Sequence, residues 1–397
     1  MVTVQLKLVD AGDLYLSWRW EHDPTRPRAL VLPRELVADA VARWAAAVPS
    51  PLPGENADAA LQRALTGGPL LDREREIALA GALSRALLPA QLAVELQGWL
   101  DQGVRPRLRV QPSPSTALVP WEALRVDEAE RLVHLVEVCA LAPATVANGP
   151  GRRVSPFRPQ GTVVAVLDPP VPGFADHSAL GSVLPAPVPA LASLGVRRPV
   201  DRDELEAALA GAARLLYVGH VTTGGHALDA RLHLSCGLAT TGRAAPLGAH
   251  RPLTAADLAL GHRPGPARPW RIPNRVALVA CESGGDVRFA EPSGLVTTLV
   301  HGGAEFVAAT RWTLPTDAGL TALAPGFPAE PVLGPTVLAV DAAQAADDPV
   351  RALNDWQRER ATRWESTGDP AATPLVWAAF TTTWAPHSAG RTAAGPP

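Results

Sequence analysis

The sequence is poor in several residue types on which common protein chemistries depend. Lys7 is the only lysine and Met1 the only methionine. A phosphate-binding P-loop needs a lysine directly after a glycine, whereas Lys7 lies in the stretch Gln-Leu-Lys-Leu. Schiff-base and pyridoxal-phosphate enzymes need a buried lysine amine, for which Lys7 is a poor candidate. The sequence therefore argues against all of these classes.

Cysteine is also scarce. The three cysteines, Cys139, Cys236 and Cys281, are odd in number and far apart, and the sequence holds no C-x-x-C or H-E-x-x-H motif. This pattern excludes a disulfide framework and gives no sign of a zinc site. We expect no metal and no cofactor, and a reducing cytoplasm is the natural compartment. Cys139 and Cys236 are expected to be core residues.

Long apolar runs are missing as well. No stretch approaches the ~18 residues of a membrane span, and the N-terminus does not have the pattern of a signal peptide. The formal net charge of −3 gives no reason to expect a nucleic acid or membrane partner. The 397 residues, 47% of them hydrophobic, are enough for a large core and for two to three lobes of ~150 residues.

The order of predicted elements indicates the fold class. Helices are expected at 33–48 and 73–102, the second interrupted by Pro89, with a strand at 108–110. After a linker-like stretch at 145–161, strands at 162–167, 214–218, 275–280 and 305–310 alternate with helices at 202–212, 254–260 and 293–301. Helices at 336–346 and 348–365 and a strand-like run at 375–380 follow. Such alternation predicts a mainly parallel sheet that is covered on both faces.

Two of these predicted strands end in residues suited to nucleophilic catalysis. His220 follows the strand at 214–218, and Cys281 follows the strand at 275–280. In an open parallel sheet, functional groups gather beyond the carboxyl ends of the strands. If the two strands are neighbours, an imidazole and a thiol meet there, as a cysteine nucleophile requires. Taken singly, each residue also fits a structural role, because strand-end cysteines are often small buried hydrophobes.

Eight segments, in order, resemble the CHAT family of caspase-like, clan CD cysteine peptidases related to separase. The most telling are PWEAL at 120–124, LLYVGH at 215–220, LTAADL at 253–258, ACESG at 280–284, RWTLPTD at 311–317 and PLVWAAF at 374–380. The resemblance spans roughly residues 75–385. It implies a caspase-like three-layer α/β/α sandwich with a mainly parallel sheet, to which we add an N-terminal α/β lobe.

The resemblance also implies the chemistry. His220 and Cys281 would form the catalytic dyad, and the backbone N–H groups of Val221 and Cys281 would form the oxyanion hole. The family usually carries glycine where this chain has Val221. Valine resists positive φ, so a turn that needs such a conformation would displace the oxyanion hole. A second histidine, His226, follows no strand, and we favour His220.

Substrate specificity is the least determined feature. Glu282 and Asp286 border the nucleophile, and Asp317 lies further along. Glu282 or Asp286 could bind a basic side chain of a substrate through a bidentate arginine pair, and Asp317 could line the pocket. Glu282 is better explained as a brace of the turn, and Asp317 is equally suited to capping a following helix. Trp121 and Glu122 are expected to brace the two lobes.

These expectations lead to a division of the chain and to two competing functions. We expect an N-terminal lobe over 1–150, which could be a non-catalytic caspase-like half, a linker over 151–160, a catalytic core over 161–386 and a disordered tail over 387–397. The first hypothesis is a latent bacterial cysteine endopeptidase, active in defence or cell death, with a separate activator or target-recognition protein. The alternative is an inactive caspase-like scaffold. A small-molecule-binding α/β domain is a weak third, because no phosphate-binding fingerprint is present.

Overall fold

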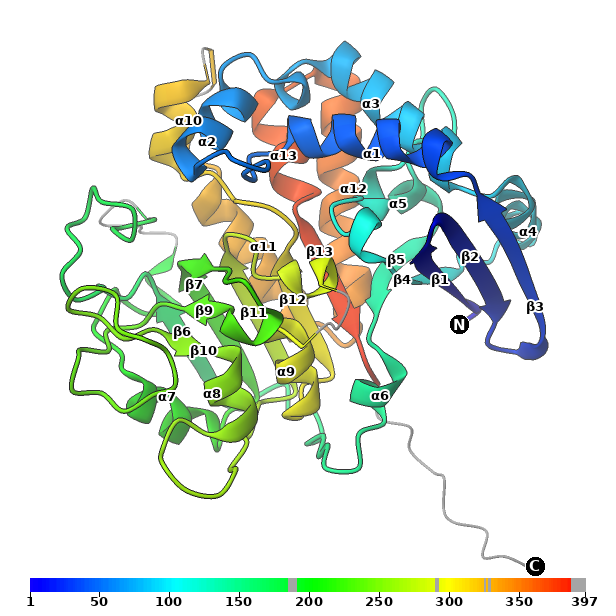
Figure 1. The fold of residues 1–397 in the computed structure, drawn as a ribbon. Helices are drawn as coiled ribbons and strands as arrows, with labels where there is room; N and C mark the ends of the chain where they lie inside the picture. The colour runs from blue at the N-terminus through cyan, green and yellow to red at the C-terminus, as the bar shows by residue number, and fades with distance from the viewer. Residues whose placement is uncertain (185–190, 290–292, 325, 328–329, 387–397) are drawn as a thin grey trace, which may run out of the picture.

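The structure is a computed structural model that describes residues 1–184, 191–289, 293–324, 326–327 and 330–386. Its centre is one ten-stranded sheet in the order β3-β2-β1-β4-β5-β13-β12-β11-β7-β6 (Figure 1). Six of its nine neighbouring strand pairs are parallel. The strands are β1 (Thr3–Ala11), β2 (Asp13–Trp20), β3 (Asp23–Leu32), β4 (Arg107–Gln111), β5 (Glu137–Leu141), β6 (Val163–Leu167), β7 (Arg214–Gly219), β11 (Arg275–Ala280), β12 (Phe306–Thr310) and β13 (Phe380–Trp384).

Helices cover both faces of the sheet, and this confirms the predicted three-layer α/β/α class. Alternating side chains of the strands enter two separate cores: Leu216 and Val218 of β7 face one, and Leu215 and Tyr217 face the other. The first core contains α1 (Arg34–Ala47), α3 (Arg73–Leu87), α11 (Leu333–Ala345), α12 (Pro349–Thr367) and α13 (Pro374–Trp377). The second contains α7 (Arg202–Leu209), α8 (Ala255–Leu260) and α9 (Leu295–His301).

The remaining elements are short or peripheral. They are the helices α2 (Ala57–Leu65), α4 (Ala90–Leu100), α5 (Leu132–Leu135), α6 (Ala144–Ala147) and α10 (Asp317–Leu323), and the small sheet β8 (Val221–Thr222), β9 (Arg231–Leu232) and β10 (Leu253–Thr254). The 3₁₀ turns are η1 (Pro69–Leu71), η2 (Pro114–Thr116), η3 (Trp121–Ala123), η5 (Ala227–Asp229), η6 (Gly285–Arg288) and η7 (Pro370–Ala372). Thr254 and Asp257 form the capping box of α8 that the sequence pattern predicts.

The N-terminal strands are the main feature that the sequence interpretation missed. Strands β1, β2 and β3 form an antiparallel meander, and β1 continues into the main sheet by pairing in parallel with β4. Their alternation is visible in the sequence: Leu6 and Leu8 of β1 are buried, and Lys7 between them is exposed. The N-terminal part thus extends the core sheet instead of building a sheet of its own.

The predicted strand at 375–380 is wrong. Residues Pro374–Trp377 form helix α13, and the strand begins only at Phe380. Thr373 caps this helix, since its Oγ1 accepts the N–H of Leu375 at 3.2 Å, and proline suits the first turn of a helix. The tail at 387–397, for which disorder is expected, lies outside the described residues.

Two smaller expectations are confirmed. Cys139 and Cys236 are buried core residues. Trp121 is buried too, and Oε1 of the neighbouring Glu122 accepts a hydrogen bond from Arg311 at 3.0 Å, while its Oε2 lies 2.8 Å from the same guanidinium as an ion pair. This buried ion pair joins the 120–124 segment to the end of β12, as expected of a brace.

Among the described residues, no single helix is long and apolar enough to cross a bilayer. Taken together, α3 and α4 are long and apolar enough to cross one, by length and composition alone, but the pair is bent by 102°.

Candidate active site

Two adjacent parallel strands place the predicted dyad at one edge of the sheet. Strand β7 pairs with β11 over its whole length, and Gly219 lies opposite Ala280 in the register. His220 and Cys281 are the next residue on each strand. The structure therefore brings the two residues to neighbouring positions beyond the carboxyl ends of the strands, where sites of open α/β sheets form.

The His220 imidazole is held by a backbone carbonyl. Its Nε2 lies 2.6 Å from the oxygen of Gly181. A carbonyl only accepts, so Nε2 carries the proton and Nδ1 keeps its lone pair. Burial lowers the pKa of His220, while the Gly181 carbonyl and the Asp168 carboxylate oppose that shift. The ring is thus a neutral base with Nδ1 free to take a proton.

The Cys281 thiol is in its neutral form. Its Sγ donates a weak hydrogen bond to the carbonyl of Leu314, at 3.9 Å. The residue keeps some exposed surface, but burial of the thiol dominates and raises its pKa to about 11. Within the described residues no hydrogen bond joins Cys281 to His220. The two side chains therefore do not form a thiolate–imidazolium pair in the structure.

The turn after Cys281 is locked to both neighbouring strands. Ser283 Oγ donates to the carbonyl of Leu278 at 2.9 Å and accepts the N–H of Thr310 at 3.0 Å. The N–H of Gly284 donates to the carbonyl of Thr310 at 2.8 Å. A Cβ on Gly284 would lie 3.2 Å from that oxygen, a tight contact that a larger residue could make only with a small shift of the backbone. These contacts explain why positions 283 and 284 suit a serine and a glycine.

Glu282 occupies the tight position of this turn. Its φ of 51° lies in the left-handed region, which non-glycine residues seldom adopt. Its carboxylate pairs with Arg288 Nη1 at 2.9 Å, and Arg288 Nη2 donates to the carbonyl of Arg311 at 2.8 Å. Glu282 is therefore engaged in bracing the turn.

The two other acidic residues proposed for specificity have different situations. Asp317 caps α11, because its Oδ1 accepts the N–H groups of Val332 and Leu333 at 2.7 and 3.1 Å. Its other oxygen, Oδ2, is buried and has no hydrogen-bond partner among the described residues. Asp286 lies in the η6 turn, and its side chain is outside the described part. Contact of any of the three with substrate stays a prediction.

Val221 fits its backbone without strain. It begins strand β8, is buried, and pairs with Leu232 of β9. In the described chain only Asp168 and Glu282 combine a side chain with positive φ. The turn after His220 thus uses extended backbone, which suits a β-branched residue. The oxyanion hole of Val221 and Cys281 N–H groups stays a prediction.

A small hollow lies beside the turn that follows Cys281. It is lined by Thr223, Glu282, Phe289, Gly294 and the exposed His226, among others, and has a volume of about 10 Å³. That is roughly the room that one water molecule needs. An amino-acid side chain of a substrate does not fit there unless the turn moves.

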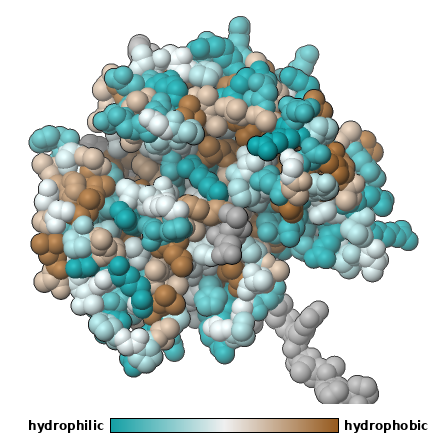
Figure 2. Space-filling model, in the orientation of Figure 1, coloured by the Kyte–Doolittle hydropathy of each residue, from teal (hydrophilic) through white to brown (hydrophobic). Residues whose placement is uncertain are grey.

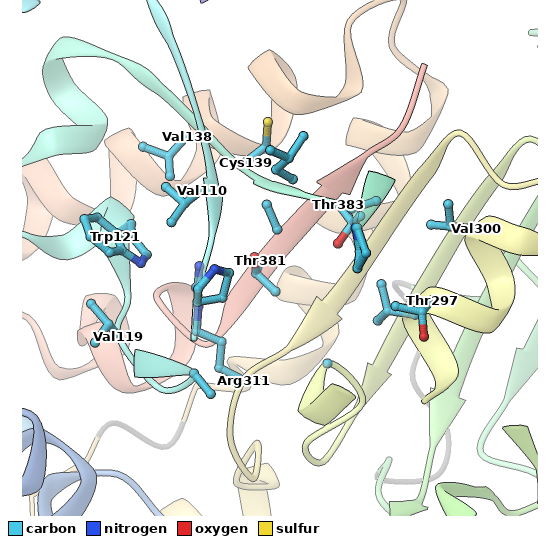
Figure 3. Close-up of a pocket in the computed structure, with 18 residues that line it drawn as sticks. Val110, Val119, Trp121, Val138, Cys139, Thr297, Val300, Arg311, Thr381 and Thr383 are labelled. Atoms are coloured by element: carbon cyan, nitrogen blue, oxygen red, sulfur yellow. The ribbon is translucent and has the colours of Figure 1, made fainter. Parts of the chain in front are cut away.

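A partly open cavity lies behind the same turn (Figure 3). It measures about 50 Å³ and is bounded by strands β4, β5 and β13 on one side and by α9, Gly284 and Arg311 on the other. Trp121 also lines it, and its buried indole N–H has no hydrogen-bond partner among the described residues. Cofactor pockets measure ~300 Å³ or more, so we assign no cofactor to this cavity.

One cluster in the described residues has the composition of a metal site: Asp203, Glu206 and His262. Its chemistry argues against one. Trp270 Nε1 donates to His262 Nδ1 at 3.3 Å, so His262 Nε2 carries the proton, which it donates to Asp203 at 3.0 Å. Arg263 Nη2, 2.6 Å from Asp203, already supplies a positive charge. A protonated Nε2 offers no lone pair to a metal.

Sequence reasoning missed the residues that hold the dyad from outside its own strands. Gly181 and Leu314 act through backbone carbonyls, which leave no trace in residue type. For Asp168 the sequence did contain an indication of a site residue. It directly follows the predicted strand at 162–167, at the same edge of the sheet as His220. A charged residue at that position could have been included in the site.

Comparison with protein families shows to which family the chain belongs. The CHAT domain model matches residues 78–384, more than three quarters of the chain. The chain belongs to the CHAT domain family. The matched region of this CHAT protein includes both strand ends of the site, together with β4 and β5 of the part expected to be a separate lobe.

Solved structures and curated sequences add little to this assignment. The CHAT chain is similar to two crystal structures of the Saccharomyces cerevisiae separase–securin complex, with 11% and 10% identity and TM-scores of 0.46 and 0.47. Each match covers 96% of this chain and 30% of the separase-complex chain, so this protein spans less than a third of that length. No curated protein sequence matches it.

Proposed function

We propose that this CHAT protein is a cysteine endopeptidase with His220 as base and Cys281 as nucleophile. The observation that carries the proposal is the register of β7 and β11, which sets the two residues side by side at the sheet edge. The tautomer of His220 supports it, because the Gly181 carbonyl leaves Nδ1 available as a base. Membership of the CHAT domain family supports it as well.

In the proposed reaction, the Cys281 sulfur attacks the carbonyl carbon of the scissile peptide bond. The thiol proton passes to His220 Nδ1 during the attack, since a thiol with a pKa of about 11 is protonated at neutral pH. The imidazolium then protonates the leaving amine, the C–N bond breaks, and a thioester remains. Water activated by His220 hydrolyses the thioester and restores the thiol. The N–H groups of Val221 and Cys281 would stabilise the oxyanion.

Latency is part of the proposal. The Cys281 thiol donates a hydrogen bond to the Leu314 carbonyl, and the hollow beside the turn has room for about one water molecule. Substrate binding therefore requires the 281–289 turn to move, and we propose that a separate protein triggers this. A bacterial defence or cell-death role in the cytoplasm, and P1 recognition by Glu282, Asp286 or Asp317, belong to the same proposal.

The same contacts favour an alternative, an inactive caspase-like scaffold. In such a protein the Cys281–Leu314 bond would be permanent, and the thiol would be a core residue like Cys139. The two functions differ in one property: only a peptidase gains thiol reactivity from His220.

That property can be measured by labelling with a peptidyl acyloxymethyl ketone, with the modified cysteine mapped by mass spectrometry. We expect selective labelling of Cys281, and its rate should fall in His220→Ala. Without His220 the reaction relies on the thiolate, whose fraction rises about tenfold per pH unit below the pKa. The difference between wild type and His220→Ala should therefore be large near neutral pH and shrink towards pH ~10.

His226→Ala is the matched control, since this exposed histidine lies near the same turn. It should label like the wild type. Labelling of Cys281 that is equal with and without His220 at every pH would favour the scaffold. In addition, Cys281→Ala should abolish cleavage of any protein substrate while leaving the circular dichroism spectrum unchanged.

A further inference from the structure

We infer that Asp168 is a positioning residue of the proposed dyad: its buried carboxylate holds the 181–184 segment so that the Gly181 carbonyl orients His220. The inference rests on the proposed function and extends it to residues on a third strand. It is carried by a continuous series of hydrogen bonds from the end of β6 to the imidazole.

Asp168 lies beside the dyad. It follows β6, which pairs in parallel with β7, and the N–H of Asp168 donates to the carbonyl of Val218 at 2.7 Å. The residue is only 1% exposed, and its φ of 48° lies in the left-handed region. A buried carboxylate in a backbone conformation disfavoured for non-glycine residues is costly, and persists when the surroundings fix it.

Three donors from one short segment converge on this carboxylate. Oδ1 accepts the N–H of Val183 at 3.1 Å. Oδ2 accepts the hydroxyl of Ser182 at 2.5 Å and the N–H of Leu184 at 3.3 Å. The carboxylate thereby fixes the three residues that directly follow Gly181. An asparagine offers one acceptor oxygen and would turn an N–H towards one of these donors.

The fixed segment presents the Gly181 carbonyl to His220 at 2.6 Å. Gly181 is required there, because a Cβ would lie 2.2 Å from the carbonyl oxygen of Asp176. Arg197 supports the same arrangement: its Nε donates to the carbonyl of Asp168 and its Nη2 to the carboxylate of Asp176, each at 2.8 Å. Arg197 thus joins two parts of the loop that follows β6: Asp168 at its start, and Asp176, which precedes Gly181.

Besides positioning His220, Asp168 acts on it through its negative charge. In the proposed reaction His220 becomes an imidazolium in a buried site, where the cationic form is disfavoured. The Asp168 carboxylate raises the pKa of His220 against that burial. Asp168 would therefore both orient the base and stabilise its charged form, without contacting the substrate.

The test uses the full chain with Asp168→Asn and the milder Ser182→Ala, which removes only one of the three bonds. Ser178→Ala is the matched control, because Ser178 lies in the same loop, is exposed, and bonds to the Ala175 carbonyl instead of to Asp168. We measure the rate of Cys281 labelling by the acyloxymethyl ketone against pH, and the His220 pKa by NMR.

Asp168→Asn should slow labelling near neutral pH by about tenfold or more, the size of effect expected from misplacing a catalytic base. It should also lower the His220 pKa. Ser182→Ala should show a smaller effect in the same direction, and Ser178→Ala none. Because Asp168 acts through His220, Asp168→Asn should cause no further loss in a His220→Ala background.

An equal loss in both backgrounds, or an unchanged His220 pKa, would overturn the inference, since Asp168 would then be merely structural. If the wild type shows no His220-dependent labelling, the proposed function fails instead. The His220 pKa still tests the positioning role in that case. Should Asp168→Asn not fold, Ser182→Ala against Ser178→Ala decides the question.

Discussion

At the scale of single residues, the buried His233 and His250 form a pair next to the proposed base. The N–H of His233 donates to the carbonyl of His220 at 3.1 Å. His250 Nδ1 donates to the Cys236 carbonyl at 2.8 Å, so its Nε2 accepts the Nδ1 proton of His233 at 3.1 Å. His233 Nε2 then accepts the hydroxyl of Thr222, at 2.9 Å. Both rings must be neutral for this chain of hydrogen bonds to exist. Burial, and then His250, lowers the pKa of His233 to about 3.

This pair predicts sensitivity to acid. An unfolded histidine has a pKa of ~6.5, so below that pH the unfolded chain binds protons that the folded chain does not. The contribution of His233 to the free energy of unfolding is fully present above pH ~6.5 and is lost as the pH falls towards about 3, the pKa of the folded histidine. His233→Asn should reduce the loss between pH ~6 and ~4 by about 1 kcal/mol per pH unit. Urea unfolding at several pH values measures it, and exposed His177→Asn is the control.

An unchanged pH slope in His233→Asn would show that the acid sensitivity has another origin. The neighbouring charges to consider are those that also lower these pKa values, Arg231 beside His233 and Arg202 beside His250.

At the scale of elements, an ion-pair network with a fully buried centre joins three helices. Arg131, at the start of α5, donates to both oxygens of Glu76 of α3, at 2.8 and 2.6 Å, and to Glu365 of α12 at 2.7 Å. Trp364 adds its indole N–H to Glu76 at 3.0 Å. Arg131 and Glu76 are both 0% exposed. Removing one member leaves a charge buried without its partner.

Arg131→Met should therefore lower the free energy of unfolding by about 3–5 kcal/mol. Denaturant unfolding followed by tryptophan fluorescence measures the loss. The control is Arg43→Met, which breaks an exposed pair with Asp39 at 2.8 Å and should cost less than about 1 kcal/mol. Similar losses in the two variants would mean that burial does not decide the strength of the Arg131 network.

At the scale of the whole molecule, the sheet is shared between the N-terminal part and the CHAT core. Strand β5 pairs in parallel with β13, through Ala140 with Thr383 and Leu141 with Trp384, and β13 in turn pairs with β12. The buried Glu122–Arg311 pair crosses the same junction. Without residues 1–150, β13 would become an exposed edge.

We therefore expect one cooperative unfolding transition, with calorimetric and van't Hoff enthalpies in agreement. Residues 151–386 expressed alone should lack native near-UV circular dichroism, and co-expression with 1–150 should restore it. Two separate transitions, or a native spectrum of 151–386 alone, would instead support the division into independent lobes that the linker composition at 145–161 suggests.

The sequence by itself determined a mainly parallel sheet covered on both faces, the strands β4, β6, β7, β11 and β12, and the place of His220 and Cys281 at strand ends, but not that β7 and β11 are neighbours. These features follow from local patterns: short apolar strands alternate with capped helices, and parallel strands end at one edge. The family motifs, which the CHAT domain match confirms, are of the same local kind. The periodicity that defines β1 and β2 was equally present in the residues, and only its interpretation was missing.

The tertiary structure alone decided how the dyad is held. Gly181 meets His220 across 39 residues, Leu314 meets Cys281 across 33, and Arg131 meets Glu365 across 234. Contacts of this kind are made by backbone carbonyls or by charges from distant helices, and residue type at one position does not reveal them. The 374–380 run is a similar case: its apolar residues suit a strand, yet the Thr373 cap and the packing of the chain make its first half a helix.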